Sequence, residues 1–192
     1  MSQPARVLSD SDMRRMLRHV RCGARATRDE VIILLSAKAG LRACEIAGLA
    51  WPMVLRPDGK LAVQIQVAGS IAKNGRGRAI PMHPDLRRAL QALHRAGGKP
   101  LVGPVIQSQR GSHMRPRSIV NWFAQLYAAN GLDGCSSHSG RRTFITRAAR
   151  LLAKSGGSLR DIQELAGHRA LSTTERYIEG DRDAQRRLIS LL

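Results

Sequence analysis

Residues 166–177 read AGHRALSTTERY, so that Tyr177 follows His168 by nine residues. Three earlier segments also place cationic side chains among small or polar residues. They are Gly40-Leu41-Arg42-Ala43-Cys44-Glu45, Ala72-Lys73-Asn74-Gly75 and His138-Ser139-Gly140-Arg141. Each segment alone is common in a chain this rich in arginine. All four in this order form a specific pattern.

The pattern places two arginines, a lysine and two histidines before a tyrosine. The transition state of phosphoryl transfer spreads negative charge over its equatorial oxygens, and fixed cations stabilise that charge. A tyrosine hydroxyl can attack phosphorus when neighbouring groups help to remove its proton. The other tyrosine, Tyr127, lies in an apolar stripe with Trp122, Phe123 and Leu126, which predicts a core position. The pattern therefore predicts metal-free phosphoryl transfer to Tyr177.

The order and spacing of these segments resemble the catalytic domain of the tyrosine recombinases, the phage integrase family. The resemblance runs from about Leu8 to the C-terminus. It implies a mainly helical α+β fold with a small three-stranded antiparallel sheet. It also implies cleavage and rejoining of DNA strands through a covalent 3′-phosphotyrosyl intermediate, without metal or ATP. Gly140 and Ala166 depart from the family, which usually has leucine at both positions.

The resemblance further implies a role for each residue of the pattern. The arginines would hold the phosphate, the lysine would protonate the leaving 5′-oxygen, the histidines would bind phosphate or transfer protons, and the tyrosine would attack. The implied catalytic residues are Arg42, Lys73, His138, Arg141, His168 and Tyr177, with Glu45 supporting Arg42. Taken singly, Arg42 could be satisfied by Glu45, Lys73 could be a solvated turn residue, and His168 could serve a structural bond.

The composition predicts a polyanionic partner. Lysine and arginine number 32 against 14 acidic residues, which gives a formal net charge of +18 and a pI near 11.6. Nucleic acid is the first candidate, and the six aromatic residues disfavour single-strand binding by base stacking. The charge alone does not separate DNA from RNA, and the resemblance implies double-stranded DNA. Candidate phosphate contacts are Arg76, Arg78, Arg110, Arg115, Arg117, Lys154 and Arg169.

The cysteines, carboxylates and apolar runs argue against a disulfide-rich, metal-binding or membrane protein. Cys22, Cys44 and Cys135 are far apart and form no Cys-x-x-Cys pair, which favours neither a disulfide framework nor a zinc site. No carboxylate cluster has the spacing of magnesium ligands, so no cofactor or metal is expected. The N-terminus lacks a leader-like apolar region, and the apolar run at residues 31–35 is too short to cross a membrane. We expect a soluble, cytoplasmic protein.

A length of 192 residues predicts a single domain, residues 1–192. Capping boxes are expected at Ser9 with Asp12, Thr27 with Glu30, and Ser158 with Asp161. Three strands are expected between residues 53 and 82, with a turn at residues 57–59 and with Lys73 in the turn before the last strand. Further helices are expected at residues 84–95, 118–129, 140–154, 159–166, 172–179 and 182–191.

The end of the chain is apolar at Leu188, Ile189, Leu191 and Leu192. Such a tail can complete its own core, or it can dock onto a neighbouring protomer, as the resemblance implies for a tetrameric assembly that holds two duplexes. The family usually also carries a separate N-terminal DNA-binding domain, and the chain leaves no room for it before Leu8. The chain is then either a naturally short form or a truncated one.

Two alternative functions remain from the sequence. A type IB topoisomerase-like or telomere-resolving enzyme uses nearly the same cations without pairing two sites. A non-catalytic DNA-binding regulator could keep the same fold. The presence of all six expected site residues favours an enzyme. The DNA target cannot be deduced from the sequence, since base contacts depend on geometry.

Overall fold

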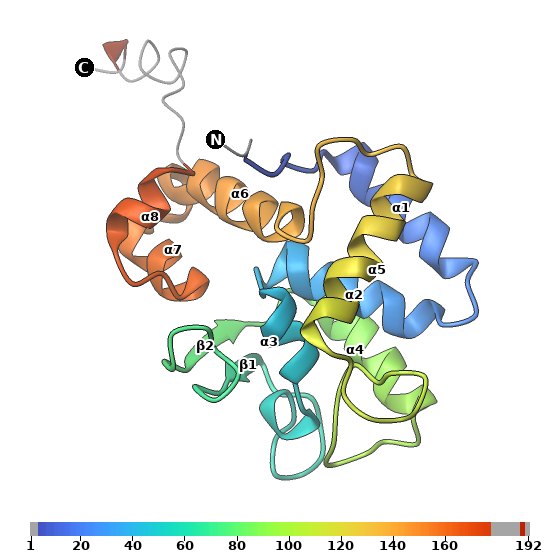
Figure 1. The fold of residues 1–192 in the computed structure, drawn as a ribbon. Coiled ribbons are helices and arrows are strands. Elements are labelled where there is room, and N and C mark those ends of the chain that lie inside the picture. The colour runs from blue at the N-terminus through green and yellow to red at the C-terminus, as the bar shows by residue number, and fades with distance from the viewer. Residues whose placement is uncertain (1–3, 178–188, 191–192) are drawn as a thin grey trace.

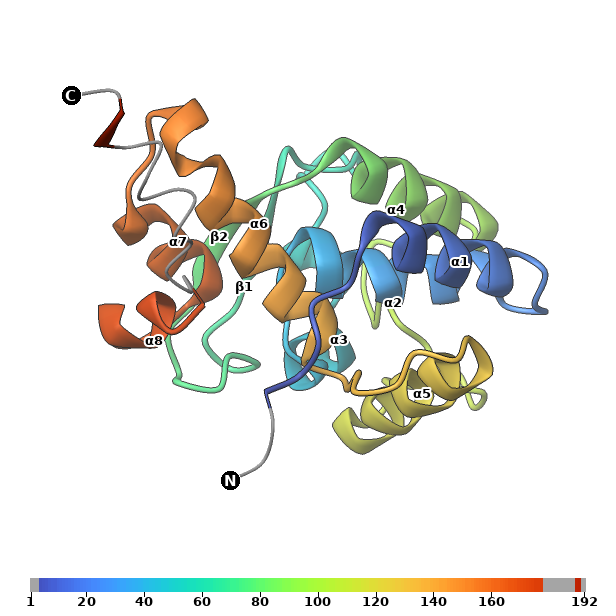
Figure 2. The same ribbon diagram turned by 90° about the horizontal axis from the view of Figure 1, so that it is seen from above.

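The computed structural model describes residues 4–177 and 189–190. Helices α6, α7 and α8 gather on one side of the molecule, and α1, α2, α4 and α5 lie on the other (Figures 1 and 2). The elements in chain order are α1 (Asp10–Arg21), α2 (Ala26–Lys38), α3 (Ala43–Gly48), the 3-10 turn η1 (Trp51–Met53), β1 (Gln64–Val67), β2 (Arg78–Pro81), α4 (Pro84–Ala96), α5 (Pro116–Ala129), α6 (Ser139–Ser155), α7 (Leu159–Ala166) and α8 (Leu171–Glu175).

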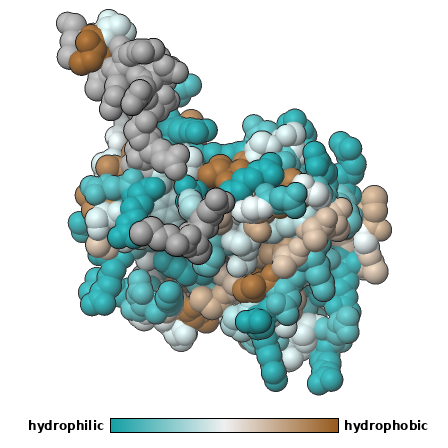
Figure 3. Space-filling view, turned by 45° about the horizontal axis from the view of Figure 1, so that its top comes forward, coloured by the Kyte–Doolittle hydropathy of each residue, from teal (hydrophilic) through white to brown (hydrophobic). Residues whose placement is uncertain are grey.

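Helix α2 forms the middle of the main core. All of its residues from Val31 to Ala37 are buried, because α2 packs against α1, α4 and α6. A helix that is covered on several sides has apolar residues all round, which explains the apolar run at residues 31–35. No described helix is long and apolar enough to cross a membrane. The face drawn in Figure 3 is mostly hydrophilic, with apolar side chains scattered over it.

The sheet has two strands in the described part of the chain, so the prediction of three strands is wrong in number. Strands β1 and β2 pair antiparallel, with Val67 opposite Arg78. The segment expected as the first strand forms only an isolated bridge between Leu55 and Leu61. Its preceding residues adopt η1, in which the N–H groups of Val54 and Leu55 both donate to the Trp51 carbonyl. Those donors are therefore not available to a neighbouring strand.

Two of the three predicted capping boxes are confirmed. The Ser9 hydroxyl accepts from the Asp12 N–H while the Asp12 carboxylate accepts from the Ser9 N–H. In the box at Ser158, the Asp161 carboxylate accepts from both the N–H and the hydroxyl of Ser158. The box at Thr27 and Glu30 is wrong, because α2 begins two residues earlier than a Thr27 cap requires and Arg25 takes the cap position. The Glu30 carboxylate instead accepts hydrogen bonds from the Arg21 guanidinium, the shorter at 2.6 Å.

The predicted helix bounds agree with α4, α5, α6 and α7 to within two residues. The helix expected at residues 172–179 is shorter than predicted, because α8 ends at Glu175 and residues 176–177 form a turn. Residues 178–179 lie outside the described residues. The helix expected at 182–191 also lies outside them, apart from residues 189 and 190. The mainly helical α+β fold itself is confirmed.

A second, smaller hydrophobic cluster joins α6 to α7. It consists of Ile145, Ile162 and Ala166, and Tyr177 packs against it while partly buried. Helix α6 links this cluster to the main core through Gly140, where a Cβ atom would lie only 2.8 Å from the Cβ of Ser36. Glycine at this position therefore lets α6 approach α2 closely, which sets the position of the following residue, Arg141.

Candidate active site

Glu45 is fully buried and is bonded to two arginines. Both of its carboxylate oxygens accept from Arg78, at 2.8 and 3.0 Å, and both accept from Arg42, one from its N–H at 2.9 Å and one from its guanidinium at 3.2 Å. Burial alone would raise the pKa of Glu45, but these bonds lower it on balance, so the carboxylate is ionised at neutral pH. Glu45 thus sets the direction of the Arg42 side chain at the beginning of α3.

Arg141 joins two backbone turns at the base of the site. Its Nη1 donates to the Gly40 carbonyl and its Nη2 to the Ala166 carbonyl, each at 2.6 Å. Gly40 has a positive φ of 64°, and the Phe144 ring covers it so closely that no side chain would fit there. Burial and the charge of Arg42 lower the pKa of Arg141 to about 9, which leaves the guanidinium charged at neutral pH.

Arg78 lies inside the molecule, unlike the other candidate phosphate contacts. Besides its bonds to Glu45, its Nε donates to the Leu165 carbonyl at 2.8 Å, and its side chain is only 8% exposed. These bonds connect β2 with α3 and α7. The remaining candidates are exposed: Arg76, Arg110, Arg115, Arg117, Lys154 and Arg169.

His168 is positioned by the turn that ends α7. Gly167 ends the helix in the left-handed conformation, with φ of 63°, and His168 follows it. The Nδ1 of His168 lies 2.9 Å from the hydroxyl of the buried Thr174, and the His168 and Tyr177 rings stack at a centroid distance of 5.7 Å. Burial, followed by the charges of Arg141 and other nearby arginines, lowers the pKa of His168 to about 4. The imidazole is therefore neutral at pH 7.

Tyr177 faces a cavity of about 300 Å³ near the beginning of α6. The N-terminal residues Pro4 and Ala5 form one wall of this cavity, and His138 and Arg141 also line it. The guanidinium carbon of Arg142 lies over the Tyr177 ring, 5.7 Å from its centroid. Burial, and then the charges of Arg141, Arg42 and Lys73, lower the pKa of His138. The tyrosine is thus surrounded by cationic or donor groups.

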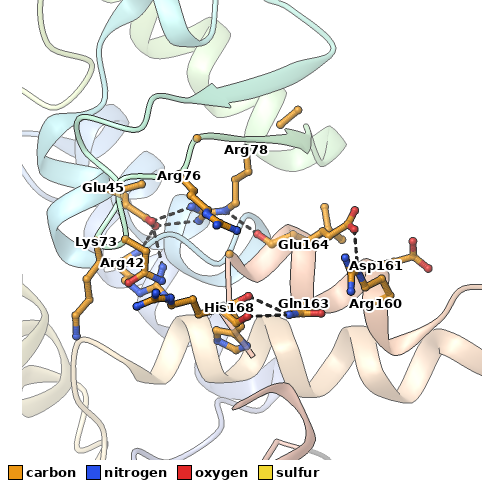
Figure 4. Close-up of a pocket in the computed structure, with 17 residues that line it drawn as sticks. Arg42, Glu45, Lys73, Arg76, Arg78, Arg160, Asp161, Gln163, Glu164 and His168 are labelled. Atoms are coloured by element: carbon orange, nitrogen blue, oxygen red, sulfur yellow. Dashed lines mark hydrogen bonds and ion pairs between the residues drawn. The ribbon is translucent and has the colours of Figure 1, made fainter. Parts of the chain in front are cut away.

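Lys73 extends from the loop between β1 and β2 and is exposed. Together with Arg42 and His168, it lines a second cavity of about 800 Å³ (Figure 4). Figure 4 shows Lys73 and Arg42 at one end of this cavity and Arg160 at the other. His138, Arg141 and Tyr177 line the first cavity, whereas Arg42, Lys73 and His168 line the second. The stacked rings of His168 and Tyr177 link the two groups.

Several residues of the site were not identified from the sequence. The carbonyls of Leu165 and Ala166, which hold Arg78 and Arg141, belong to the unsatisfied groups that every helix end provides, but the sequence does not show which arginine they meet. Thr174 had no distinguishing signal beside Thr173. Among the described residues, no group of three or more His, Cys, Asp or Glu is placed to hold a metal ion.

A model described as the phage integrase family matches residues 6–183. This chain belongs to that family, and its fold is the catalytic domain of the tyrosine-type recombinases. Tyrosine recombinase XerC of Pelobacter propionicus is 32% identical over 152 residues, which cover 78% of this chain and 47% of the relative. XerC of Nitrobacter winogradskyi is 34% identical over 157 residues, with 78% and 45% covered. The chain thus spans about half the length of these relatives.

Solved structures show the same fold. The Tn1549 transposon integrase in complex with transposon right end DNA has a TM-score of 0.76 at 20% identity, covering 99% of this chain and 67% of that one. The XerH site-specific recombinase bound to its difH substrate has a TM-score of 0.71 at 18% identity, covering 99% and 55%. A lambda integrase dimer bound to a COC′ core site has a TM-score of 0.65, also at 18% identity, covering 93% and 49%.

Proposed function

We propose that this chain is a site-specific recombinase that cleaves and rejoins double-stranded DNA through a covalent 3′-phosphotyrosyl bond at Tyr177. The observation that carries the proposal is the position of Tyr177 against a cavity lined by His138 and Arg141, beside a second cavity lined by Arg42 and Lys73. A phosphate bound between the residues of the two cavities would have the nucleophile on one side and the amine on the other.

In the proposed cleavage step, the Tyr177 hydroxyl oxygen bonds to phosphorus while the bond from phosphorus to the 5′-oxygen breaks. The hydroxyl proton passes to a neighbouring base, for which the neutral imidazole of His138 is the candidate. The leaving 5′-oxygen takes a proton from the Lys73 ammonium. Rejoining reverses the step when a 5′-hydroxyl attacks the phosphotyrosine, so the exchange needs no external energy source.

The arginines would stabilise the charge that develops on the equatorial oxygens. The bonds of Arg42 to Glu45 and of Arg141 to two carbonyls fix both guanidinium groups before DNA arrives. Such preorganised donors cost no reorganisation in the transition state. Arg141 has five N–H donors, and the two carbonyls engage two of them. His168 would help to position the nucleophile, because it bonds to Thr174 and stacks on the Tyr177 ring.

Exposed arginines other than the two proposed phosphate clamps would bind the DNA backbone. Arg110 and Arg115 line a hollow of about 590 Å³ beside the beginning of α5, together with Arg28 and His113. Arg76 and Arg169 line the cavity that contains Lys73. The excess of positive charge supports this role, because each lysine or arginine that meets a phosphate releases bound counterions. We place the reaction in the cytoplasm, where such DNA is accessible.

We further propose that the chain assembles on DNA as a homo-oligomer, in a tetrameric synapse, through its apolar C-terminal tail. Leu188, Leu191 and Leu192 of that tail lie outside the described residues. Support comes from the run of apolar residues at the chain end and from the lambda integrase relative, which is a dimer on its core site. The single-domain organisation of residues 1–192 stays a prediction.

A suicide substrate tests the proposed function. A duplex with a nick just downstream of the cleavage site loses, by diffusion, the short fragment that carries the new 5′-hydroxyl, which traps the covalent intermediate. We expect a denaturant-resistant adduct to accumulate in buffer with EDTA, with the DNA attached to the tryptic peptide that contains Tyr177. An adduct that forms only after magnesium is added would contradict the metal-free mechanism, and DNA binding without any adduct would favour the regulator.

A further inference from the structure

The loop that carries Lys73 is closed by contacts that leave no room for side chains. A Cβ atom at Gly69 would lie 2.5 Å from the Gly75 carbonyl oxygen, and one at Gly77 would lie 2.8 Å from the Val67 carbonyl oxygen. The N–H of Ala72 donates to Ala68 and Gly69 within the same loop. The base of the loop is therefore compact. Lys73 itself is exposed, so its position depends on how this loop is fixed to the rest of the molecule.

Ile71 fixes the loop to α3. A Cβ atom at Gly48 would lie 2.6 Å from the Cγ2 and 3.0 Å from the Cβ of Ile71. Both distances are too short for ordinary packing, and the Cβ of a β-branched residue cannot move without its backbone. Ile71 is half-buried and packs against the main core. The absence of a side chain at Gly48 thus lets Ile71 lie directly on the helix.

The same short helix begins at the cap residue Arg42 and contains Glu45. The contact between Gly48 and Ile71 therefore fixes the Lys73 loop against α3, the helix that directs the Arg42 guanidinium. Lys73 and Arg42 line the same end of one cavity (Figure 4). A general acid must lie within hydrogen-bond reach of the leaving oxygen, while the arginine holds the same phosphate. The contact between Gly48 and Ile71 therefore sets the distance between the Lys73 ammonium and the Arg42 guanidinium.

We propose that Gly48 and Ile71 are positioning residues for Lys73: Ile71, seated on the bare backbone at Gly48, holds the general acid at a fixed distance from Arg42. The proposal rests on the proposed function, since it assigns to this contact the placement of the proposed acid. It predicts that a methyl group at Gly48 displaces the loop and leaves the arginine site intact. The change should therefore resemble the loss of Lys73 and not the loss of Arg42.

The test uses the full chain and two substrates, ordinary nicked duplex and the same duplex with a 5′-bridging phosphorothiolate. Sulfur leaves as a thiolate and needs no proton, so the second substrate bypasses the general acid. We expect Gly48→Ala to slow cleavage of ordinary DNA on the order of 100-fold, the scale of a 1 Å misplacement, and to cleave the sulfur substrate nearly as fast as the wild type. Gly97→Ala is the matched control, because Gly97 has φ of −84° and room for a methyl group.

A second variant gives an independent result. Ile71→Ala removes the Cγ2 atom that the new methyl group would meet. The double variant, Gly48→Ala with Ile71→Ala, should therefore cleave ordinary DNA about tenfold faster than Gly48→Ala alone. Such coupling is expected for two residues in direct contact. Trypsin provides a readout without DNA. Cutting after Lys73 and Arg76 should be faster in Gly48→Ala than in the wild type, and should slow again in the double variant.

Two results would overturn the proposal: equal slowing of Gly48→Ala on both substrates, or a double variant no faster than Gly48→Ala. A failure of the general-acid role would look different, because Lys73→Ala itself would then gain nothing from the sulfur substrate. In that case the trypsin experiment still decides the contact, and unchanged cutting in Gly48→Ala would overturn it. If Gly48→Ala fails to fold, Ile71→Ala alone must show the loosened loop and recovery on the sulfur substrate.

Discussion

Two arginines, Arg42 and Arg141, contribute positive charge to the proposed phosphate site, and they are held differently. Arg42 is held by a carboxylate, and its side chain keeps 16% of its surface exposed. Arg141 is buried and donates to two backbone carbonyls. The loss of Arg42 should remove a phosphate contact, whereas the loss of Arg141 should also leave two buried acceptors without donors.

We expect Arg42→Ala and Arg141→Ala each to cost about 3 kcal/mol or more in cleavage, the scale for one preorganised donor. Arg141→Ala should also lower the free energy of unfolding by about 1–3 kcal/mol, because the Gly40 and Ala166 carbonyls lose their partner. Single-turnover cleavage and urea unfolding measure the two effects. A free energy of unfolding of Arg141→Ala equal to that of the wild type would contradict the part that Arg141 plays in joining the two turns.

The protonation of His168 should make stability depend on pH. Its pKa is about 4 in the folded chain and near 6.5 when unperturbed. Between these values the unfolded chain binds a proton that the folded chain does not, so the free energy of unfolding should fall as the pH drops from about 6.5 to 4. His168→Asn keeps an amide that can bond Thr174 and does not titrate. The difference in melting temperature between the two proteins should therefore change across this range; a constant difference would show that His168 does not contribute.

At the scale of the elements, the site depends on how closely α6 approaches α2. Gly140 allows the contact with Ser36, and Arg141 and Phe144 follow on the same helix. Gly140→Ala should destabilise the protein by about 1–3 kcal/mol, the usual cost of excess volume in a packed core. Combining it with Ser36→Gly should cost less than the sum of the two single changes. Urea unfolding of the four proteins measures this coupling, and strict additivity would contradict a direct clash.

The sequence predicted the elements best where local signals decide them. The capping boxes at Ser9 and Ser158 and the helix ends near Gly97 and Asn130 depend on neighbours in the chain. It failed where distant groups compete. Glu30 bonds to Arg21 and not to the Thr27 cap, and η1 takes the N–H groups that a third strand would need. Neither the Arg21 bond to Glu30 nor the hydrogen bonds of η1 can be identified from the sequence alone.

The site shows the same limit. The motif spacing predicted that six residues would form one site, and the structure places three of them in each of two cavities. It did not predict that Arg78 would lie inside, because its partners, Glu45 and the Leu165 carbonyl, are 33 and 87 residues away in the chain. A charged residue two positions after the exposed Arg76 is expected on the surface unless a buried carboxylate is known to face it. Burial of opposite charges therefore has to be read from the structure.

At the scale of the whole molecule, the positive charge should make DNA binding strongly dependent on salt. Affinity should fall by about one log unit per log unit of salt for each phosphate neutralised. Arg110→Ala and Arg115→Ala should each reduce that slope by about one. Arg21→Ala, which removes a cation already paired with Glu30, is the control and should leave the slope nearly unchanged. Binding titrations at several salt concentrations measure the slope for each variant. Equal slopes for Arg110→Ala, Arg115→Ala and Arg21→Ala would contradict the proposed phosphate contacts.

The apolar tail should matter for assembly more than for binding. Removing residues 188–192 should reduce cooperative binding to paired sites and strand exchange, while salt-sensitive binding to a single site persists. Gel-shift and recombination assays on the same preparation compare these effects. Normal recombination by the shortened chain would contradict the assembly role. Its unfolding would likewise contradict that role and would assign the tail to the core of its own protomer.

The central claim is that Tyr177 becomes covalently bound to DNA. Tyr177→Phe removes one oxygen and no charge, and Tyr127→Phe is a matched control because its buried hydroxyl has no hydrogen-bond partner among the described residues. On the nicked substrate, we expect Tyr127→Phe to form adduct like the wild type. Tyr177→Phe should form none while binding DNA with nearly unchanged affinity. A denaturant-resistant adduct with Tyr177→Phe would contradict the account.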